Sequence, residues 1–164
     1  MPEYAPQTLL ETHEVINAPP LLAGRNLYAE DRPLREVARL HGGDWVEEPL
    51  SALGGAVGSE EVLQWGEDAN RYALELQAFD RFGRRLDEVK FYQAYHRLTA
   101  LAMEHRVHSI GWREKREGKH VAHAAMFALC SQAEAGTMCP ISMTYASVAA
   151  LRHQGRCCGS VGSK

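Results

Sequence analysis

Apolar residues recur every three or four positions along most of the chain after residue 31, which is the pattern of amphipathic helices. In three segments these residues share one helix face: Leu34, Val37, Ala38 and His41; Val62, Trp65, Ala69 and Tyr72; Phe91, Tyr95, Leu98 and Ala102. Asp31 and Ser59 can cap the first two helices, and Gly42-Gly43 can end the first. The pattern therefore predicts helices over 31–43, from Ser59 onward, and from Phe91 toward residue 107.

The segment between the first two of these helices holds two further signals. Asp44 and Glu47 have the spacing of a capping box, although Pro49 weakens a helix start there. The glycine-rich run GGAVGS (54 to 59) could be a phosphate loop or the end of this helix followed by a cap serine. A phosphate loop needs a lysine after its last glycine. None follows here, so the helix end is favoured.

The helical rhythm breaks between residues 74 and 89. The run LELQAFDRFGRRLDEV has a turn signal, Asp80 to Gly83, between two short segments that contain apolar residues. A small β-hairpin and an extended loop both fit this pattern.

The second half of the chain contains an alanine-rich helix between Gly118 and Gly136. Small residues let helix backbones approach closely, so we expect this helix at the centre of a bundle. Pro140 suits the first turn of a last helix, which extends to about His153. The fold class is therefore mainly α: a bundle of about five or six helices, with an extended N-terminal arm over residues 1–30 and one small hairpin where 74–89 pair.

The composition and charge of the chain exclude several classes of protein but do not indicate a function. The chain has 164 residues, 45% of them hydrophobic and 24% charged, which is ordinary for one soluble domain. The net charge of −3 gives no basic face for nucleic acid. The acidic start lacks the basic region of a secretory signal, and the longest apolar stretch, VAHAAMFALC, is too short to cross a bilayer. We expect a cytoplasmic protein that contacts no membrane.

Several side chains could carry chemistry, but their spacing assembles no complete site. The histidine pairs His105/His108 and His120/His123 are three residues apart and could bind metal, but they lack the partner spacing of known zinc motifs, so structural roles are favoured. Cys139, beside Pro140, is a nucleophile or, as we favour, a packed thiol.

Glu134 lies in a helix of otherwise small residues. It lines a pocket or marks the solvated edge of that helix, and the sequence does not separate these alternatives. The residues alone thus predict no catalytic, cofactor-binding or metal-binding site.

Three longer stretches together resemble the AidB-type proteins, flavoproteins of the acyl-CoA dehydrogenase superfamily linked to the adaptive response to DNA alkylation. These stretches are THEVINAPPLLAGRNLYAED (12 to 31), GRRLDEVKFYQAYHRLTALAMEHRVHSIGW (83 to 112) and AEAGTMCPISMTYA (133 to 146). The resemblance implies an N-terminal helical domain over residues 1–154. It fades toward the tail, 155–164, whose sequence GRCCGSVGSK has the look of a shifted reading frame or a truncated gene, with a genuine short C-terminus as the alternative.

The resemblance also implies what this chain holds of the family's site. The last helices before the family's β-rich domain wall the acyl and flavin cleft, which makes Cys130, Glu134 and Met138 candidates for one wall of the substrate pocket. The family's flavin-contacting loop, catalytic glutamate and DNA-binding region lie downstream of the resemblance. FAD is therefore expected in the full-length family and not in this chain.

Two functions follow as expectations. The first is a structural and assembly fragment of an AidB-like oxidoreductase, without catalysis, nucleic-acid binding or membrane contact of its own, and prone to self-association. The alternative is a stand-alone helical module that binds a protein partner.

Overall fold

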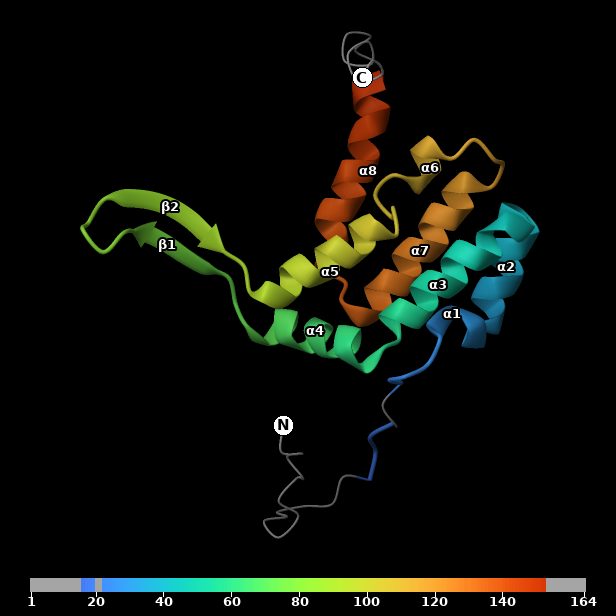
Figure 1. Ribbon diagram of the computed structural model, residues 1–164, viewed down its shortest axis with the longest axis horizontal. Coiled ribbons are helices and arrows are strands. Elements are labelled where there is room, and N and C mark those ends of the chain that lie inside the picture. The colour runs from blue at the N-terminus through green and yellow to red at the C-terminus, as the bar shows by residue number, and fades with distance from the viewer. Residues whose placement is uncertain (1–15, 20–21, 153–164) are drawn as a thin grey trace.

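The computed structural model describes residues 16–19 and 22–152, and within them the chain is a helical bundle with one β-hairpin (Figure 1). In chain order the elements are α1 (Leu27–Glu30), α2 (Arg32–Gly42), the 3₁₀ turn η2 (Asp44–Val46), α3 (Glu47–Val57), α4 (Glu60–Arg71), β1 (Glu75–Phe79), β2 (Arg85–Lys90), α5 (Gln93–Glu104), α6 (Ile110–Arg113), α7 (Lys119–Ala133) and α8 (Met138–Arg152).

The mainly α class is confirmed, and the hairpin forms. The described residues hold eight α-helices where five or six were predicted, because α1 and α6 are single turns of four residues, too short for a periodic signal. The arm was predicted as extended through residue 30, but α1 is helical: the Asn26 side chain accepts from the amides of Tyr28 and Ala29. The predicted tail, 155–164, lies outside the described residues.

Helix α7 lies at the centre of the bundle, as its small residues predict. It packs against α2, α3, α4, α6 and α8. Its buried alanines, Ala122 and Ala125, let the neighbouring backbones come close, while Met126 and Leu129 fill the core beside Leu50 of α3. The apolar periodicity thus predicts the individual helices, and α7 is the central helix against which most of them pack.

Two of the predicted caps form and one does not. Asp31 accepts a hydrogen bond from the amide of Leu34 at 2.9 Å, and Ser59 accepts one from Val62 at 3.3 Å. The capping box expected from Asp44 and Glu47 was wrong: α3 begins at Glu47 with no side-chain cap. The Glu47 carboxylate instead accepts from the Tyr28 hydroxyl at 3.0 Å and from Arg35 at 3.1 Å.

The glycine-rich run ends a helix and allows a close approach, as favoured over a phosphate loop. Gly54 lies inside α3, and a Cβ there would come within 2.6 Å of the Asn26 side-chain oxygen and 2.7 Å of the Tyr28 nitrogen. Only glycine therefore lets α1 pack against this face of α3.

The hairpin extends away from the helices (Figure 1). Its strands pair antiparallel, with Leu76 opposite Val89 and Phe79 opposite Arg85, and the register shifts between Gln77 and Phe79. Asp87 in β2 has φ of 51°, which is where the extra residue of this bulge is accommodated.

Helix α8 also projects from the bundle (Figure 1). Of its 15 residues only Met138 and Ile141, both near its start, are buried. None of the described helices combines the length and apolar character that a membrane span requires.

Candidate functional site

The junction between α7 and α8 holds two of the three predicted pocket-wall residues and the cap that joins the helices. Helix α7 ends at Ala133, three residues before the predicted stop at Gly136, because Glu134 is extended with φ of −160°. The Glu134 carboxylate accepts hydrogen bonds from the amides of Gly136 at 2.7 Å and Thr137 at 2.6 Å. Both amides lie in the turn just before Met138, where α8 begins, so the carboxylate closes the turn that leads from α7 into α8.

Of the two alternatives for Glu134, the structure excludes the solvated edge, and a place in the wall of a substrate pocket stays a prediction. Glu134 is only 9% exposed, so it is not a solvated edge, and its carboxylate is engaged with the backbone. It holds the turn between α7 and α8.

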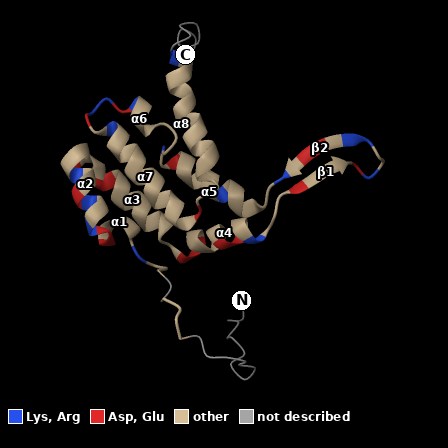
Figure 2. Cartoon of the chain, turned by 180° about the vertical axis from the view of Figure 1, so that it is seen from behind, with Lys and Arg blue, Asp and Glu red and all other residues tan. Residues whose placement is uncertain are grey.

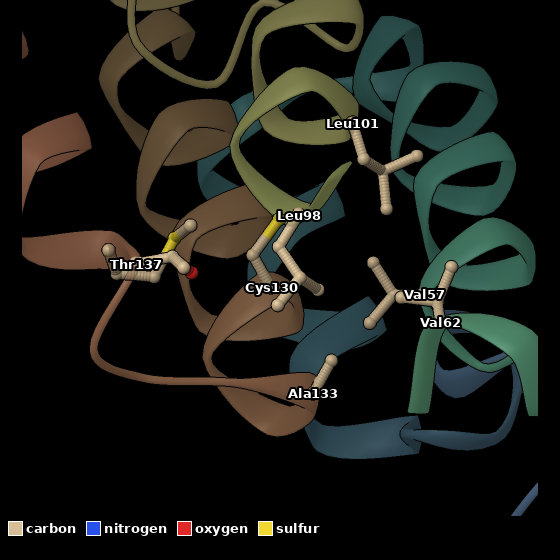
Figure 3. A pocket seen from close by; sticks show the side chains of 8 residues that line it. Val57, Val62, Leu98, Leu101, Cys130, Ala133 and Thr137 are labelled. Carbon is tan, nitrogen blue, oxygen red and sulfur yellow. The ribbon is translucent and has the colours of Figure 1, made fainter. Parts of the chain in front are cut away.

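A small apolar cavity lies beside this turn, where α4, α5, α7 and the start of α8 meet the end of α3 (Figure 3). Its lining residues are Val57, Val62, Leu98, Leu101, Cys130, Ala133, Thr137 and Met138. The predicted wall residues Cys130 and Met138 are thus brought together, whereas Glu134 is not among the lining residues.

The cavity is too small for an acyl chain. Its free volume, about 10 Å³ at the centres of water-sized spheres, is room for about one water molecule. The described residues around this cavity therefore do not enclose an acyl-binding site.

The cavity also offers no reactive group at neutral pH. Burial raises the pKa of the Cys130 thiol to about 12, so the thiol stays protonated. The Thr137 hydroxyl donates to the backbone oxygen of Glu134 at 3.3 Å. This surface can shape and exclude water from an apolar ligand, but by itself it supplies neither a base nor a nucleophile.

A wider hollow lies on the other side of Ala133, between α4 and the end of α7. Its free volume is about 650 Å³, and its lining includes Leu63, Gly66, Glu67, Asn70, Arg71 and Gln132. At one edge of this hollow α4 passes directly over the end of α7: a Cβ on Gly66 would lie 2.1 Å from the Ala133 carbonyl oxygen. Sequence reasoning missed this hollow, and the single glycine inside a helical stripe was the available signal.

His120 and His123, which were considered as metal ligands, instead contact Tyr145 and so pack α7 against α8. His123 donates from Nδ1 to the Val107 carbonyl at 2.7 Å, and its ring stacks on Tyr145 with centroids 3.5 Å apart. His120 hydrogen-bonds the Tyr145 hydroxyl through Nδ1. Within the part of the chain that the structure describes, no group of three or more His, Cys, Asp or Glu side chains is placed to hold a metal ion.

The position of Cys139 differs from the one predicted. We expected a packed thiol, but the side chain is exposed in the first turn of α8. The turn that Glu134 caps directs Met138 inward, where it lines the cavity, and leaves Cys139 at the surface.

Sequence comparisons place these features beside known proteins. The family model described as "Adaptive response protein AidB N-terminal domain" matches residues 17–163, a range that runs through most of the tail. The putative acyl-CoA dehydrogenase AidB of Escherichia coli strain K12 is 42% identical over 138 residues, which cover 84% of this chain and 26% of that protein. The chain thus spans about a quarter of the length of this curated relative.

Two solved structures share the fold. The structure titled Caenorhabditis elegans ACDH-11 in complex with C11-CoA superposes with a TM-score of 0.72 at 24% identity, covering 88% of this chain and 26% of that one. The structure titled Bd2924 apo-form gives the same TM-score at 22% identity, covering 80% of this chain and 27% of that one.

Proposed function

The chain belongs to the AidB N-terminal domain family, and we propose that it serves as the helical N-terminal unit of an acyl-CoA dehydrogenase-type flavoprotein linked to the adaptive response to DNA alkylation. Its role is structural: it carries one wall of the substrate cleft and the surface on which the rest of the protein assembles. By itself it neither binds FAD nor catalyses a reaction.

The bare surface of α8 is the observation that carries this proposal. The helix has no charged residue before Arg152, and apolar side chains such as Met143 and Leu151 are exposed. Met138 and Ile141 are buried and Tyr145 packs against His120 and His123, but most of the other α8 residues are exposed, and this exposed part of the helix suits a contact with further protein.

The cavity at the start of α8 supports the proposal that this chain carries one wall of the substrate cleft. Cys130 and Met138 present an apolar wall, and Glu134 fixes the angle at which the wall meets α8. An acyl chain would need a larger space than these residues enclose, so the second wall comes from the downstream part of the parent protein.

The absence of independent flavin binding has a direct test. The purified chain is incubated with excess FAD, passed through a desalting column and scanned for flavin absorbance, with the E. coli relative treated in parallel. We expect no retained flavin, because the described surface offers only one wall. A stoichiometric yellow complex would contradict the proposal.

The partners we propose are the remainder of the parent protein and other copies of this chain, in the cytoplasm, with no DNA contact by this chain. The net charge of −3 supports the last point, because few phosphates could be neutralised at once. A mobility shift that persists at physiological salt would refute it. The alternative role, a stand-alone interaction module, is favoured by one observation, the exposed hairpin.

A further inference from the structure

One residue, Tyr145, holds the projecting part of α8 against the bundle. Its ring stacks on His123 with centroids 3.5 Å apart and an interplanar angle of 4°, and its hydroxyl hydrogen-bonds Nδ1 of His120. The indole N–H of Trp112 in α6 donates to the Tyr145 carbonyl oxygen at 2.8 Å. We call this cluster of Tyr145, Trp112, His120 and His123 the tyrosine clasp.

The clasp is built to receive the phenol ring. A Cβ on Gly111 would lie 2.5 Å from the Tyr145 hydroxyl oxygen and 2.9 Å from Nδ1 of His120, so glycine at this position leaves the room that the hydroxyl occupies. His123 is fixed in turn, because its Nδ1 donates to the Val107 carbonyl at 2.7 Å. This bond sets the tautomer of the neutral ring, and Nε2 is left with the lone pair that can accept a proton.

Apart from the clasp, few contacts attach the outer part of α8 to the bundle. The buried residues Met138 and Ile141 lie near the start of the helix, and the hydroxyl groups along it donate to carbonyl oxygens of α8 itself. Arg152 adds one contact at the far end, 4.8 Å from the Trp112 ring centroid. The direction of α8, which projects from the bundle in Figure 1, therefore depends on the clasp.

A positive charge on His123 has no partner in these surroundings. His120 lies three residues earlier on α7, and the charged residue of α8 is Arg152, which is also a cation. Figure 2 shows α8 without red or blue before its end. Within the described part of the chain, neither clasp histidine forms an ion pair with a carboxylate.

The loops on either side of α6 hold other titratable groups. His105 and His108 precede the helix, and in the loop after it Glu114 pairs with Arg116 at 2.9 Å. Glu117 in the same loop has no ion pair with a clasp histidine among the described residues. These surroundings favour an uncharged ring at the clasp.

The protonation of the clasp residues agrees with their burial. Burial lowers the pKa of His123, which the hydrogen bond to Val107 opposes in part and the neighbouring His120 reinforces. Burial raises the pKa of the Tyr145 hydroxyl, so this group stays neutral. The closed clasp therefore holds a neutral imidazole at His123.

We propose that the tyrosine clasp is a pH-dependent joint: with His123 neutral it holds α8 against α6 and α7, and protonation of His123 opens it, so that the outer part of α8 pivots about its buried start. In the open state the charged imidazole gains the water that burial in the closed clasp withholds. The joint goes beyond the proposed function, because it is a property of this chain and needs neither flavin nor downstream domains. Only its effect on the assembly surface of α8 rests on the proposed function.

Two indole protons report on the joint. The N–H of Trp112 is bonded to Tyr145 only while the clasp is closed, whereas the N–H of Trp45 donates to the Glu117 carbonyl at 2.9 Å, outside the clasp, and is the internal control. In the full 164-residue chain, NMR measures the exchange of both protons at about pH 7.5 and about pH 5.5, corrected for the intrinsic pH dependence. Residual dipolar couplings give the direction of α8 relative to α7, and circular dichroism checks folding.

The open state should gain about tenfold over the closed state at about one pH unit below the ordinary histidine pKa of about 6.5. Protection of the Trp112 N–H should therefore fall about tenfold between the two pH values, while that of Trp45 stays unchanged, and the couplings of α8 should change. His123→Gln keeps a side-chain N–H for the Val107 carbonyl but takes no proton, so it should abolish the fall. The matched control, His96→Gln at an exposed position of α5, should retain it.

A second variant tests the joint without relying on protonation or on the folding of His123→Gln. Tyr145→Ala removes the ring of the clasp and leaves Met138 and Ile141 in place. At neutral pH this variant should already show the α8 direction that the unaltered chain adopts at acid pH.

Three outcomes overturn the proposal. Equal protection of the Trp112 N–H at both pH values in the unaltered chain shows that protonation does not open the clasp. A fall that persists in His123→Gln assigns the opening to another group. Opening of the clasp by acid, or its removal in Tyr145→Ala, without a change in the direction of α8 shows that the clasp does not hold the helix.

Discussion

Replacing Glu134 by alanine should destabilise the chain strongly, because this carboxylate joins α7 to α8. The substitution removes the acceptor of two backbone N–H groups, those of Gly136 and Thr137. Hydrogen bonds to a charged group contribute about 1.5–3 kcal/mol each, and losing a helix cap costs about 0.5–2 kcal/mol. Water can replace part of this at the edge of the turn, so we expect a loss of about 2–4 kcal/mol, a large share of the about 5–15 kcal/mol that stabilises a domain.

The assay is urea unfolding, together with hydrogen exchange at the amides of Gly136 and Thr137. In a thermal melt the loss should lower Tm by about 5–12 °C for a domain of this size. Glu134→Gln keeps one acceptor oxygen and should lose about half as much. The matched control is Glu88→Ala on the exposed strand β2, which should change stability by less than about 0.5 kcal/mol. If Glu134→Ala costs no more than this control, the carboxylate does not hold the junction and the reasoning fails.

Three further outcomes follow from the structure. Gly54→Ala should lower the free energy of unfolding by about 2 kcal/mol, because the added Cβ would clash with α1. Gly55→Ala, at the next position, should raise the free energy of unfolding by up to about 1 kcal/mol. Urea unfolding measures both changes, and equal effects of the two variants would refute the close approach of α1 to Gly54. Burial lowers the pKa of His123, so the unfolded chain binds the proton more readily. The contribution of His123 to the free energy of unfolding should be constant above about pH 6.5 and should fall as the pH drops below it, and an equally steep fall in His123→Gln would assign the effect to other groups. In a chain whose two adjacent tail cysteines are replaced by serine, a thiol reagent at neutral pH should modify Cys139 rapidly and Cys130 only on unfolding, and rapid modification of both would contradict the buried wall.

Local signals predicted the elements well because their causes lie within a few residues. Asp31 and Ser59 cap helices through amides three positions ahead, and Gly43 ends α2 with φ of 82°, which few other residues adopt. The turn from Asp80 is likewise closed by its own carboxylate. The sequence therefore indicated these ends directly.

Contacts between distant residues could not be predicted in the same way. Glu47 fits a capping box, yet its carboxylate is taken by Tyr28 and Arg35, which lie 19 and 12 positions earlier. The single-turn helices α1 and α6 gave no periodic signal, since four residues make only about one turn.

At the candidate site, too, part of the structure could be predicted from the sequence and part could not. Cys130 and Met138, two of the residues that the resemblance suggested, line one cavity, and their role in a substrate pocket stays a prediction. The positions of Glu134 and Cys139 depend on one extended residue at the helix junction. That backbone angle decides which side chains turn inward. No propensity in a run of small residues encodes it.

The central claim, that this chain is an assembly unit which completes a flavoprotein, is tested most directly in a hybrid protein. Residues 17–163 replace the matching N-terminal segment of the E. coli relative, and the flavin content of the purified hybrid is measured by absorbance beside the native relative and the isolated chain. The account predicts about one FAD per chain in the hybrid, as in the native relative, and none in the isolated chain. A folded hybrid without flavin, where the native relative holds it, would contradict the account.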